Sequence, residues 1–275
     1  MRCWHACFMF ALTFFWIWSL PMLMIGVFFA IPVALVALPF CLAVTLVVQI
    51  QSNNKIIVDH WFRKWMSRIP WHEWFPCNRL KFDDQCIVTV HPHGILCCGA
   101  VVGIHLVPDS ETLLCVAPIL FYVPVIGWML RVLGCIRATK DVMQNALRAG
   151  HSLLVIPGGV PEIVLAETGD DTRRFARHGV LKLDKDMPIR VVYAKGECST
   201  YTLIRGPFLE QRVYLSWLCN IPLVTPILLG WWGTWLPKRR RITLTSKKLH
   251  IRTKRAYTEL FKELTQVKCQ SSVVR

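Results

Sequence analysis

Charged residues are missing from the first fifth of the chain: residues 3–54 contain no Asp, Glu, Lys or Arg. A membrane-spanning helix needs about 20 apolar residues, so this run is long enough for two. Arg2 precedes the run and Lys55 follows it, and an excess of Lys and Arg marks the cytosolic side of a membrane. We predict a membrane anchor over 1–54, as a hairpin or two transmembrane helices. A signal peptide would be shorter and would carry a small-residue cleavage site.

Acidic residues are also few. The chain has 17 Asp and Glu against 32 Lys and Arg, a formal net charge of +15. Hydrophobic residues make up 54% and the mean hydropathy is +0.42. This combination favours a membrane protein that faces anionic lipid. The chain has no motif of nucleic-acid-binding proteins, so we expect no nucleic acid partner.

The 12 cysteines include no CxxC pair. Scattered cysteines of this kind favour reduced thiols in an intracellular protein and argue against a disulfide framework.

From residue 55 to residue 275, short apolar runs alternate with helical patterns, which predicts an α/β domain facing the cytosol. The expected strands lie at 87–90, 152–156 and 190–194, and the expected helices at 140–149 and 256–267.

Two more uncharged segments occur in this domain. Residues 213–237 carry four tryptophans and predict a segment at the membrane interface. The basic C-terminal region 238–275 follows, with nine Lys and Arg before residue 256.

The second uncharged segment, residues 112–130, is interrupted by prolines. We expect it to form a broken, buried segment or the wall of an apolar channel, in preference to a third membrane span.

The strand at 87–90 runs into His91-Pro92-His93-Gly94. Pro92 fixes one backbone angle and Gly94 permits a tight turn. The ends of strands are where α/β folds place active groups, and an imidazole can act as a general base near neutral pH. We therefore expect His91 or His93 to be catalytic. The alternative is two structural histidines that cap a strand.

The strand at 152–156 ends in a turn that contains Gly158, Gly159 and Glu162. Paired glycines expose backbone N–H groups, which could face an oxyanion or a phosphate. A group of basic side chains follows, and these would either meet an anion or form a solvated surface. They are Arg173, Arg174 and Arg177.

Four motifs then occur in a specific order: HPHG at 91–94, GGVPE at 158–162, RHGVLKL at 177–183 and VVYAKGE at 191–197. In these the chain resembles the diacylglycerol acyltransferase 2 family, which includes monoacylglycerol acyltransferases and wax-ester synthases. The resemblance implies a glycerolipid-acyltransferase-like sheet with flanking helices. It also implies an endoplasmic reticulum or lipid-droplet location, and transfer of an acyl group from acyl-CoA to a hydroxyl.

By position, the resemblance assigns His91, His93 and Glu162 to catalysis, with a histidine as the general base. The His-x4-Asp dyad of related acyltransferases is absent, because Leu96 and Cys98 occupy the acid's place. The orienting carboxylate must come from elsewhere, and we expect Glu162 first and Glu197 second. The candidates for the CoA phosphates and the oxyanion are Lys140, Gly158, Gly159, Arg173, Arg174 and Arg177.

The chain departs from the family pattern at Lys140, at Cys198 and in a missing C-terminal signature. We expect acyl-CoA as co-substrate and a neutral acceptor in the membrane, with diacylglycerol first. The alternatives are a lysophospholipid acceptor and a non-catalytic lipid-binding relative. We expect no bound cofactor and no metal, because His91, His93 and a neighbouring cysteine lack a distant fourth ligand. Cys97 or Cys98 as an acyl-accepting nucleophile stays open, and a homo-oligomer is compatible with the sequence.

Overall fold

The structure is a computed structural model. It describes residues 60–266 except 70, 72–74, 108–109, 124–125, 175–177, 222, 224–227 and 235–236. The chain divides into two units, Met1–Lys55 and Ile56–Arg275, and the description concerns the second. The anchor predicted over 1–54 lies outside the described residues. Within the described part, no helix combines the length and the apolar character that a bilayer crossing requires.

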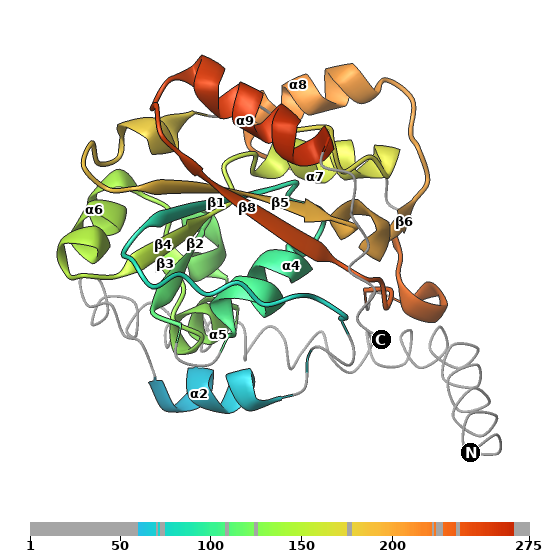
Figure 1. Cartoon of the computed structure of the whole chain (residues 1–275). Coiled ribbons are helices and arrows are strands. Elements are labelled where there is room, and N and C mark those ends of the chain that lie inside the picture. Colours follow the sequence, from blue (N-terminus) through green and yellow to red (C-terminus); the bar gives the residue numbers. More distant parts are fainter. Residues whose placement is uncertain are drawn as a thin grey trace, which may run out of the picture. The chain divides into compact units, whose positions relative to one another are not determined.

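A six-stranded sheet in the order β3-β2-β4-β1-β5-β8 forms the centre of the domain (Figure 1). Its strands are β1 (Ile87–His91), β2 (Thr112–Val116), β3 (Ile136–Arg137), β4 (Ser152–Val155), β5 (Ile189–Lys195) and β8 (Thr243–Leu249). Neighbouring strands run parallel except for β8, which is antiparallel to β5. The mixed α/β architecture and the three predicted strands are confirmed. A separate two-stranded pair joins β6 (Thr202–Leu203) to β7 (Leu228–Leu229).

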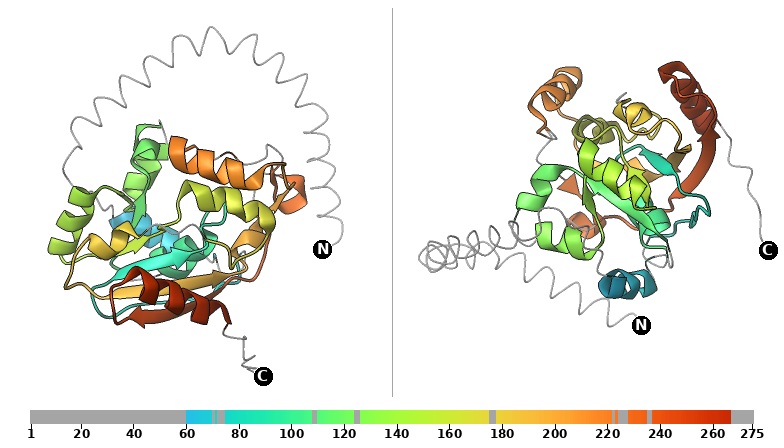
Figure 2. Two further views of the ribbon diagram at one scale, coloured as in Figure 1. Left: turned by 90° about the horizontal axis from the view of Figure 1, so that it is seen from above. Right: turned by 90° about the vertical axis from the view of Figure 1, so that its left-hand side faces the viewer.

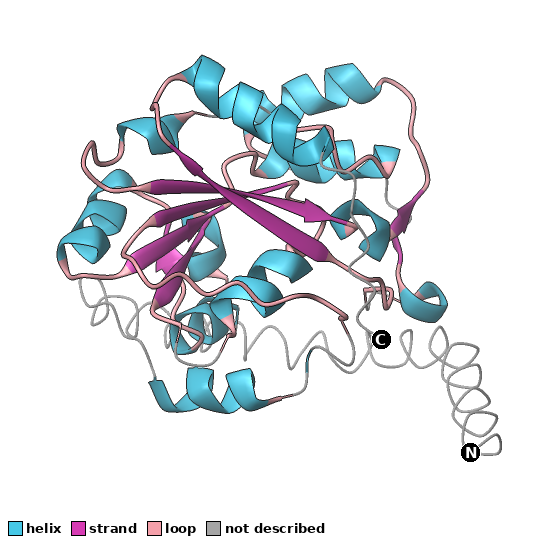
Figure 3. Ribbon diagram, in the orientation of Figure 1, coloured by secondary structure: helices cyan, strands magenta, loops and turns pink. Residues whose placement is uncertain are grey.

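Helices cover both faces of the sheet (Figure 3). The α-helices are α2 (His60–Arg68), α4 (Cys98–Ala100), α5 (Ile126–Val132), α6 (Lys140–Arg148), α7 (Val160–Leu165), α8 (Leu209–Cys219) and α9 (Lys254–Gln266). Shorter turns are the π-helix η1 (Val101–His105) and the 3-10 helices η2 (Pro118–Tyr122), η3 (Ala166–Thr168), η4 (Gly179–Lys182), η5 (Glu197–Thr200) and η6 (Trp231–Gly233). The two predicted helices correspond to α6 and α9.

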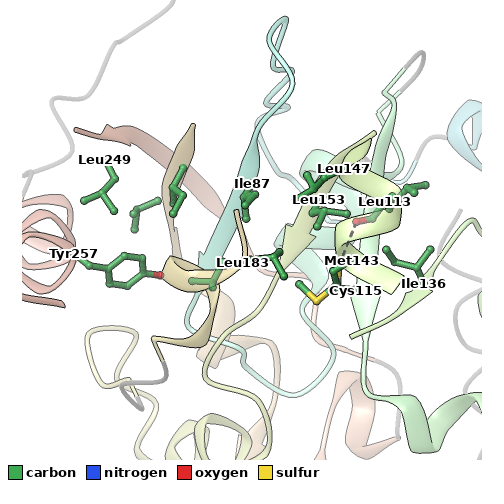
Figure 4. Packing of buried hydrophobic residues seen from close by; sticks show 14 of the residues in the cluster. Ile87, Leu113, Cys115, Ile136, Met143, Leu147, Leu153, Leu183, Leu249 and Tyr257 are labelled. Carbon is green, nitrogen blue, oxygen red and sulfur yellow. Dashed lines mark hydrogen bonds between the residues drawn. The ribbon is translucent and has the colours of Figure 1, made fainter. Parts of the chain in front are cut away.

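The core has one layer on each face of the sheet because successive strand residues point to opposite faces. Ile87 packs in a cluster with Met143 of α6 and Tyr257 of α9 (Figure 4). Its neighbour Val88 packs in a second cluster with Ile104 of η1. All of β1 is buried, as expected for an inner strand covered on both sides. The same alternation puts His91, four residues after Ile87, on the face beneath α9.

The expectation for residues 112–130 is only partly correct. The first five residues form β2, an inner strand. Most of the following η2 and α5 is not buried, since the Ile119 side chain is 64% exposed and that of Trp128 is 57% exposed. Apolar composition predicts burial, but most of the apolar side chains of η2 and α5 lie at the surface.

The basic region 238–275 contains a strand that the sequence analysis does not predict. In β8, Leu244 and Leu249 are buried in opposite core layers, and Lys248 between them is exposed. Lysine on an edge strand discourages pairing with another chain. The lysines of β8 hide its strand pattern in the sequence, and they are suited to a strand at the edge of the sheet.

Candidate active site

The last residue of β1 lies at the centre of a buried polar network. His91 has no exposed surface, and both of its ring nitrogens have partners. Nδ1 lies 2.8 Å from Oε1 of Glu162, and Nε2 lies 2.9 Å from the hydroxyl of Tyr257 on α9. The ring of Phe261 meets the imidazole edge-on at 5.5 Å between centroids. The side chain is thus fixed in position and orientation.

Glu162, in the first turn of α7, connects the two histidines. While Oε1 contacts the ring of His91, Oε2 accepts a hydrogen bond from the backbone N–H of His93 at 2.9 Å. The carboxylate turns back over Gly158, where an added Cβ would lie 1.7 Å from Cδ of Glu162. Gly159 then caps α7 with a positive φ of 56°. Gly158 therefore makes the space that the carboxylate occupies.

His93 has a different environment from His91, because its side chain is only half-buried. Its Nδ1 lies 3.0 Å from the carbonyl oxygen of Gly94. A proton on Nδ1 can be donated to that carbonyl, which leaves the lone pair on Nε2. Burial lowers the pKa of His93, and the nearby Glu162 carboxylate opposes this less strongly. The ring is therefore neutral at neutral pH, as a base must be.

Two members of the network, Tyr257 and Thr89, are absent from the predicted site. The hydroxyl of Tyr257 donates a hydrogen bond to Oγ1 of Thr89 at 2.9 Å, and burial raises the pKa of Tyr257, so the phenol stays protonated. Thr89 precedes His91 by two residues and so shares its face of β1. That spacing is a signal that could have identified it. Tyr257 has a weaker signal, its place on the apolar stripe of α9 with Phe261.

A second buried carboxylate, that of Glu197, supports the turn from the other side. It accepts hydrogen bonds from the backbone N–H groups of Cys98 and Gly99, both at 2.7 Å. Burial raises the pKa of Glu197 to about 7, against the lowering effect of these two donors. An added Cβ at Gly94 would lie 2.7 Å from Cγ of Glu197. Glu197 thus holds the backbone after the histidines, and Glu162 is the carboxylate that contacts an imidazole.

Asp171 in turn fixes the loop that carries Glu197. It accepts hydrogen bonds from the backbone N–H groups of Gly196 at 2.6 Å and Cys198 at 2.8 Å. The sequence analysis does not single out Asp171, and its position 25 residues before Gly196 gives no local signal.

The predicted basic residues do not gather at one place. Arg174 lies next to the network, with its guanidinium 4.8 Å from the ring centroid of Phe261 and hydrogen-bonded to Thr258 at 3.0 Å. Burial lowers the pKa of Arg174, and the charge of Glu162 raises it to a smaller extent. Arg173 instead forms an ion pair with Glu210 of α8 at 2.8 Å. Lys140 is exposed at the start of α6, and Arg177 lies outside the described residues.

Sulfur also lies close to His93. Sγ of Cys97 is 3.2 Å from Nδ1 and 3.6 Å from Nε2 of this histidine. Burial raises the pKa of Cys97 and of Cys98, so both are protonated thiols and poor nucleophiles. Among the residues that the structure describes, no group of three or more His, Cys, Asp and Glu side chains is arranged to hold a metal ion.

This arrangement defines a class of protein. It is an α/β domain in which a buried carboxylate holds two histidines at the carboxyl end of a parallel strand, a geometry suited to proton abstraction from a hydroxyl. A family model described as diacylglycerol acyltransferase matches residues 26–243, well over half of the chain. The chain therefore belongs to the diacylglycerol acyltransferase family.

One mouse (Mus musculus) relative is described as diacylglycerol O-acyltransferase 2-like protein 6. It is 26% identical over an alignment of 172 residues, and the match covers 54% of this chain and 51% of the relative. The chain thus spans about half the length of this relative in the match. No solved structure matches the chain.

Proposed function

We propose that the chain is a membrane-bound acyltransferase that moves a fatty acyl group from acyl-CoA to the hydroxyl of a neutral acceptor, with diacylglycerol first. Family membership supports the acyltransferase class. The observation that carries the mechanism is the different engagement of the two histidines: both ring nitrogens of His91 have buried partners, whereas the half-buried His93 can keep Nε2 unprotonated.

In this mechanism His93 is the general base. Its Nε2 takes the proton of the acceptor hydroxyl as that oxygen attacks the thioester carbonyl. The tetrahedral intermediate collapses, the C–S bond breaks, and the imidazolium returns the proton to the departing CoA sulfur. His91 and Glu162 act as positioning residues, because Glu162 holds the backbone N–H of His93 and the ring of His91 together.

The CoA phosphates need cationic partners. Arg174 is the first candidate by position, because the charge of Glu162 affects its pKa and its guanidinium lies beside α9. Lys140, Arg173 and Arg177 remain candidates from the sequence. We assign the oxyanion to the backbone around Gly94, or around Gly158 and Gly159, whose N–H groups would act as donors.

The proposed location is the endoplasmic reticulum membrane or a lipid droplet, with the domain facing the cytosol. The uncharged run over residues 3–54 supports this. So does the exposed apolar surface of α8, where the Leu218 side chain is 62% exposed and those of Tyr214 and Trp217 are also exposed. Such aromatic and aliphatic side chains suit the membrane interface.

The test uses microsomes from cells that lack their own triacylglycerol synthesis and express the full chain. Labelled acyl-CoA is supplied with diacylglycerol, monoacylglycerol, fatty alcohol or lysophospholipid in parallel. A new neutral lipid is expected from the unmutated chain and from Leu96→Ala, an exposed position in the same turn, and not from His93→Ala. Product only from lysophospholipid would overturn the acceptor class. No product from any acceptor, with the protein present in the membrane, would favour the non-catalytic relative.

A further inference from the structure

One exposed surface lies outside the candidate site. It is formed by η2, α5 and Val123 after η2, here together called the η2–α5 segment. Its exposed apolar side chains are Ile119, Leu120, Tyr122, Val123, Ile126, Trp128 and Met129. A soluble protein rarely leaves so many large apolar side chains exposed together unless the surface binds something. Aromatic residues among aliphatic ones are typical of membrane interfaces.

The segment is a built structure and not a loose loop. Gly127 of α5 packs so closely on η2 that an added Cβ would lie 2.3 Å from the carbonyl oxygen of Phe121. The ring of Phe121 is 2% exposed and belongs to the core. The exposed side chains are therefore presented on a support that is anchored in the domain.

Two arginines share the buried ring that anchors the segment. The guanidinium of Arg131, on α5, lies 5.8 Å from the ring centroid of Phe121, and that of Arg137, on β3, lies 6.0 Å from it. Arg137 also lies 5.8 Å from the ring of Tyr122. Two like charges are thus held beside one another at the edge of an apolar surface.

One of these arginines has an unsatisfied donor. Nη2 of Arg131 is buried and has no hydrogen-bond partner among the described residues. Burial and the charge of Arg137 both lower the pKa of Arg131. A buried donor without an acceptor costs free energy, and an anion between the two guanidiniums would supply the acceptor and reduce the repulsion.

Helix α8 provides a comparison elsewhere in the domain. In the right-hand view of Figure 2, the orange α8 and the red α9 both lie at the top. The arginine of α8, Arg212, is held by Glu167 through two hydrogen bonds of 2.6 and 2.8 Å. Arg212, the cation of α8, is therefore neutralised, while Arg131 of the η2–α5 segment has a guanidinium donor with no acceptor in the part of the chain that the structure describes.

We propose that the η2–α5 segment docks on a membrane surface of anionic phospholipid, with its apolar side chains in the interface and Arg131 and Arg137 on a lipid phosphate. This assigns a binding surface that the proposed reaction does not require. It holds whether or not the chain transfers an acyl group. Charge complementarity selects lipid over an apolar protein partner, because basic side chains beside interfacial apolar residues favour anionic leaflets.

The test uses the full chain reconstituted in vesicles of phosphatidylcholine, with or without phosphatidylserine, each doped with the photoactivatable form of its own lipid. Adducts are mapped by mass spectrometry. Adducts are expected within residues 118–132 with both kinds of vesicle. The yield with phosphatidylserine should exceed the yield with phosphatidylcholine by about fivefold per arginine. The exposed Ile251, on the turn before α9, serves as the reference position that should stay unlabelled.

Variants separate the charge from the apolar contact. Arg131→Gln with Arg137→Gln should remove the phosphatidylserine excess and keep the phosphatidylcholine adducts, which also reports that the segment is still folded. Arg131→Lys with Arg137→Lys should keep most of the excess. Arg255→Gln, on the exposed surface of α9, is the matched control and should change nothing. Absence of adducts in 118–132, or an excess that survives the double glutamine variant, would overturn the proposal.

Discussion

The two histidines of the HPHG turn are two residues apart, yet they lie in different environments. His91 belongs to a strand and is completely buried, with a carboxylate on one nitrogen and a phenol on the other. His93 belongs to the turn, is half-buried, and is held by its backbone N–H. The difference teaches that one short motif can combine a fixed support with an available base. The two roles are separated because His91 ends strand β1 and points into the core, whereas His93 lies in the turn that follows.

The largest expected effect comes from removing the available base. His93→Ala should lower kcat by about 10²–10⁴-fold, the usual contribution of a general base. The midpoint of thermal unfolding should change little, because the ring of His93 is not part of the buried network. The measurement is initial rate with saturating acyl-CoA and acceptor, beside a thermal unfolding curve in detergent. An unchanged rate would exclude His93 as the base.

His91→Ala should instead lower both activity and stability, since it leaves the buried Glu162 carboxylate and the Tyr257 hydroxyl without their partner. If His91→Ala and His93→Ala lost equal stability, the distinction between His91 as a support and His93 as the base would be wrong.

The next effect concerns the carboxylate that joins the two histidines. Glu162→Gln keeps the shape but replaces one acceptor oxygen by an N–H₂ group. If the new group faces the backbone N–H of His93, two donors meet. If it faces the ring of His91, the contact between that ring and a carboxylate oxygen is lost. Hydrogen bonds to a charged group contribute roughly 1.5–3 kcal/mol, and we expect the free energy of unfolding to fall by about that much. Denaturant unfolding of the detergent-solubilised chain measures it.

Arg173→Gln is the control for Glu162→Gln, because Arg173 forms an exposed ion pair with Glu210 of α8. Such pairs contribute less than about 1 kcal/mol to the free energy of unfolding. Equal losses in the two variants would contradict a special role for Glu162.

Much of this site is predictable from the sequence. The strand at 87–90, the turn after it, and the turn at 157–162 are local patterns, and parallel strands bring their carboxyl ends to one edge of the sheet. Glu162 comes close to His91 because β1 and β4 are neighbours in the sheet, a pairing that the structure shows and local patterns do not predict. The space for the carboxylate comes from Gly158, which is also local.

The remaining members of the site depend on long-range packing. Tyr257 reaches His91 across 166 residues of sequence, and only the docking of α9 on the sheet decides this contact. The exposure of the η2–α5 segment is likewise a tertiary result, because composition alone cannot distinguish an apolar surface from an apolar core. Strand β8 escapes prediction because its lysines interrupt the apolar pattern of an edge strand.

A smaller effect should follow from Tyr257→Phe. The variant removes the hydroxyl that links Nε2 of His91 to Thr89 and keeps the ring in the core. A neutral hydrogen bond contributes about 0.5–1.5 kcal/mol, so we expect a loss of stability in this range and a modest fall in kcat. Tyr193→Phe, a tyrosine in the same core layer, is a matched control for stability, and its kcat should not fall.

The pH profile offers the finest test of which histidine is the base. Burial lowers the pKa of His93 below its ordinary value near 6.5. The base must be unprotonated, so kcat/KM should be flat at neutral pH and fall as the pH drops through this lowered pKa. Tyr257→Phe should leave the position of this acid limb unchanged, because the hydroxyl contacts His91 and not His93. If His91 were the base, losing a hydrogen bond to its Nε2 would move the limb. A shifted limb would therefore reassign the base to His91.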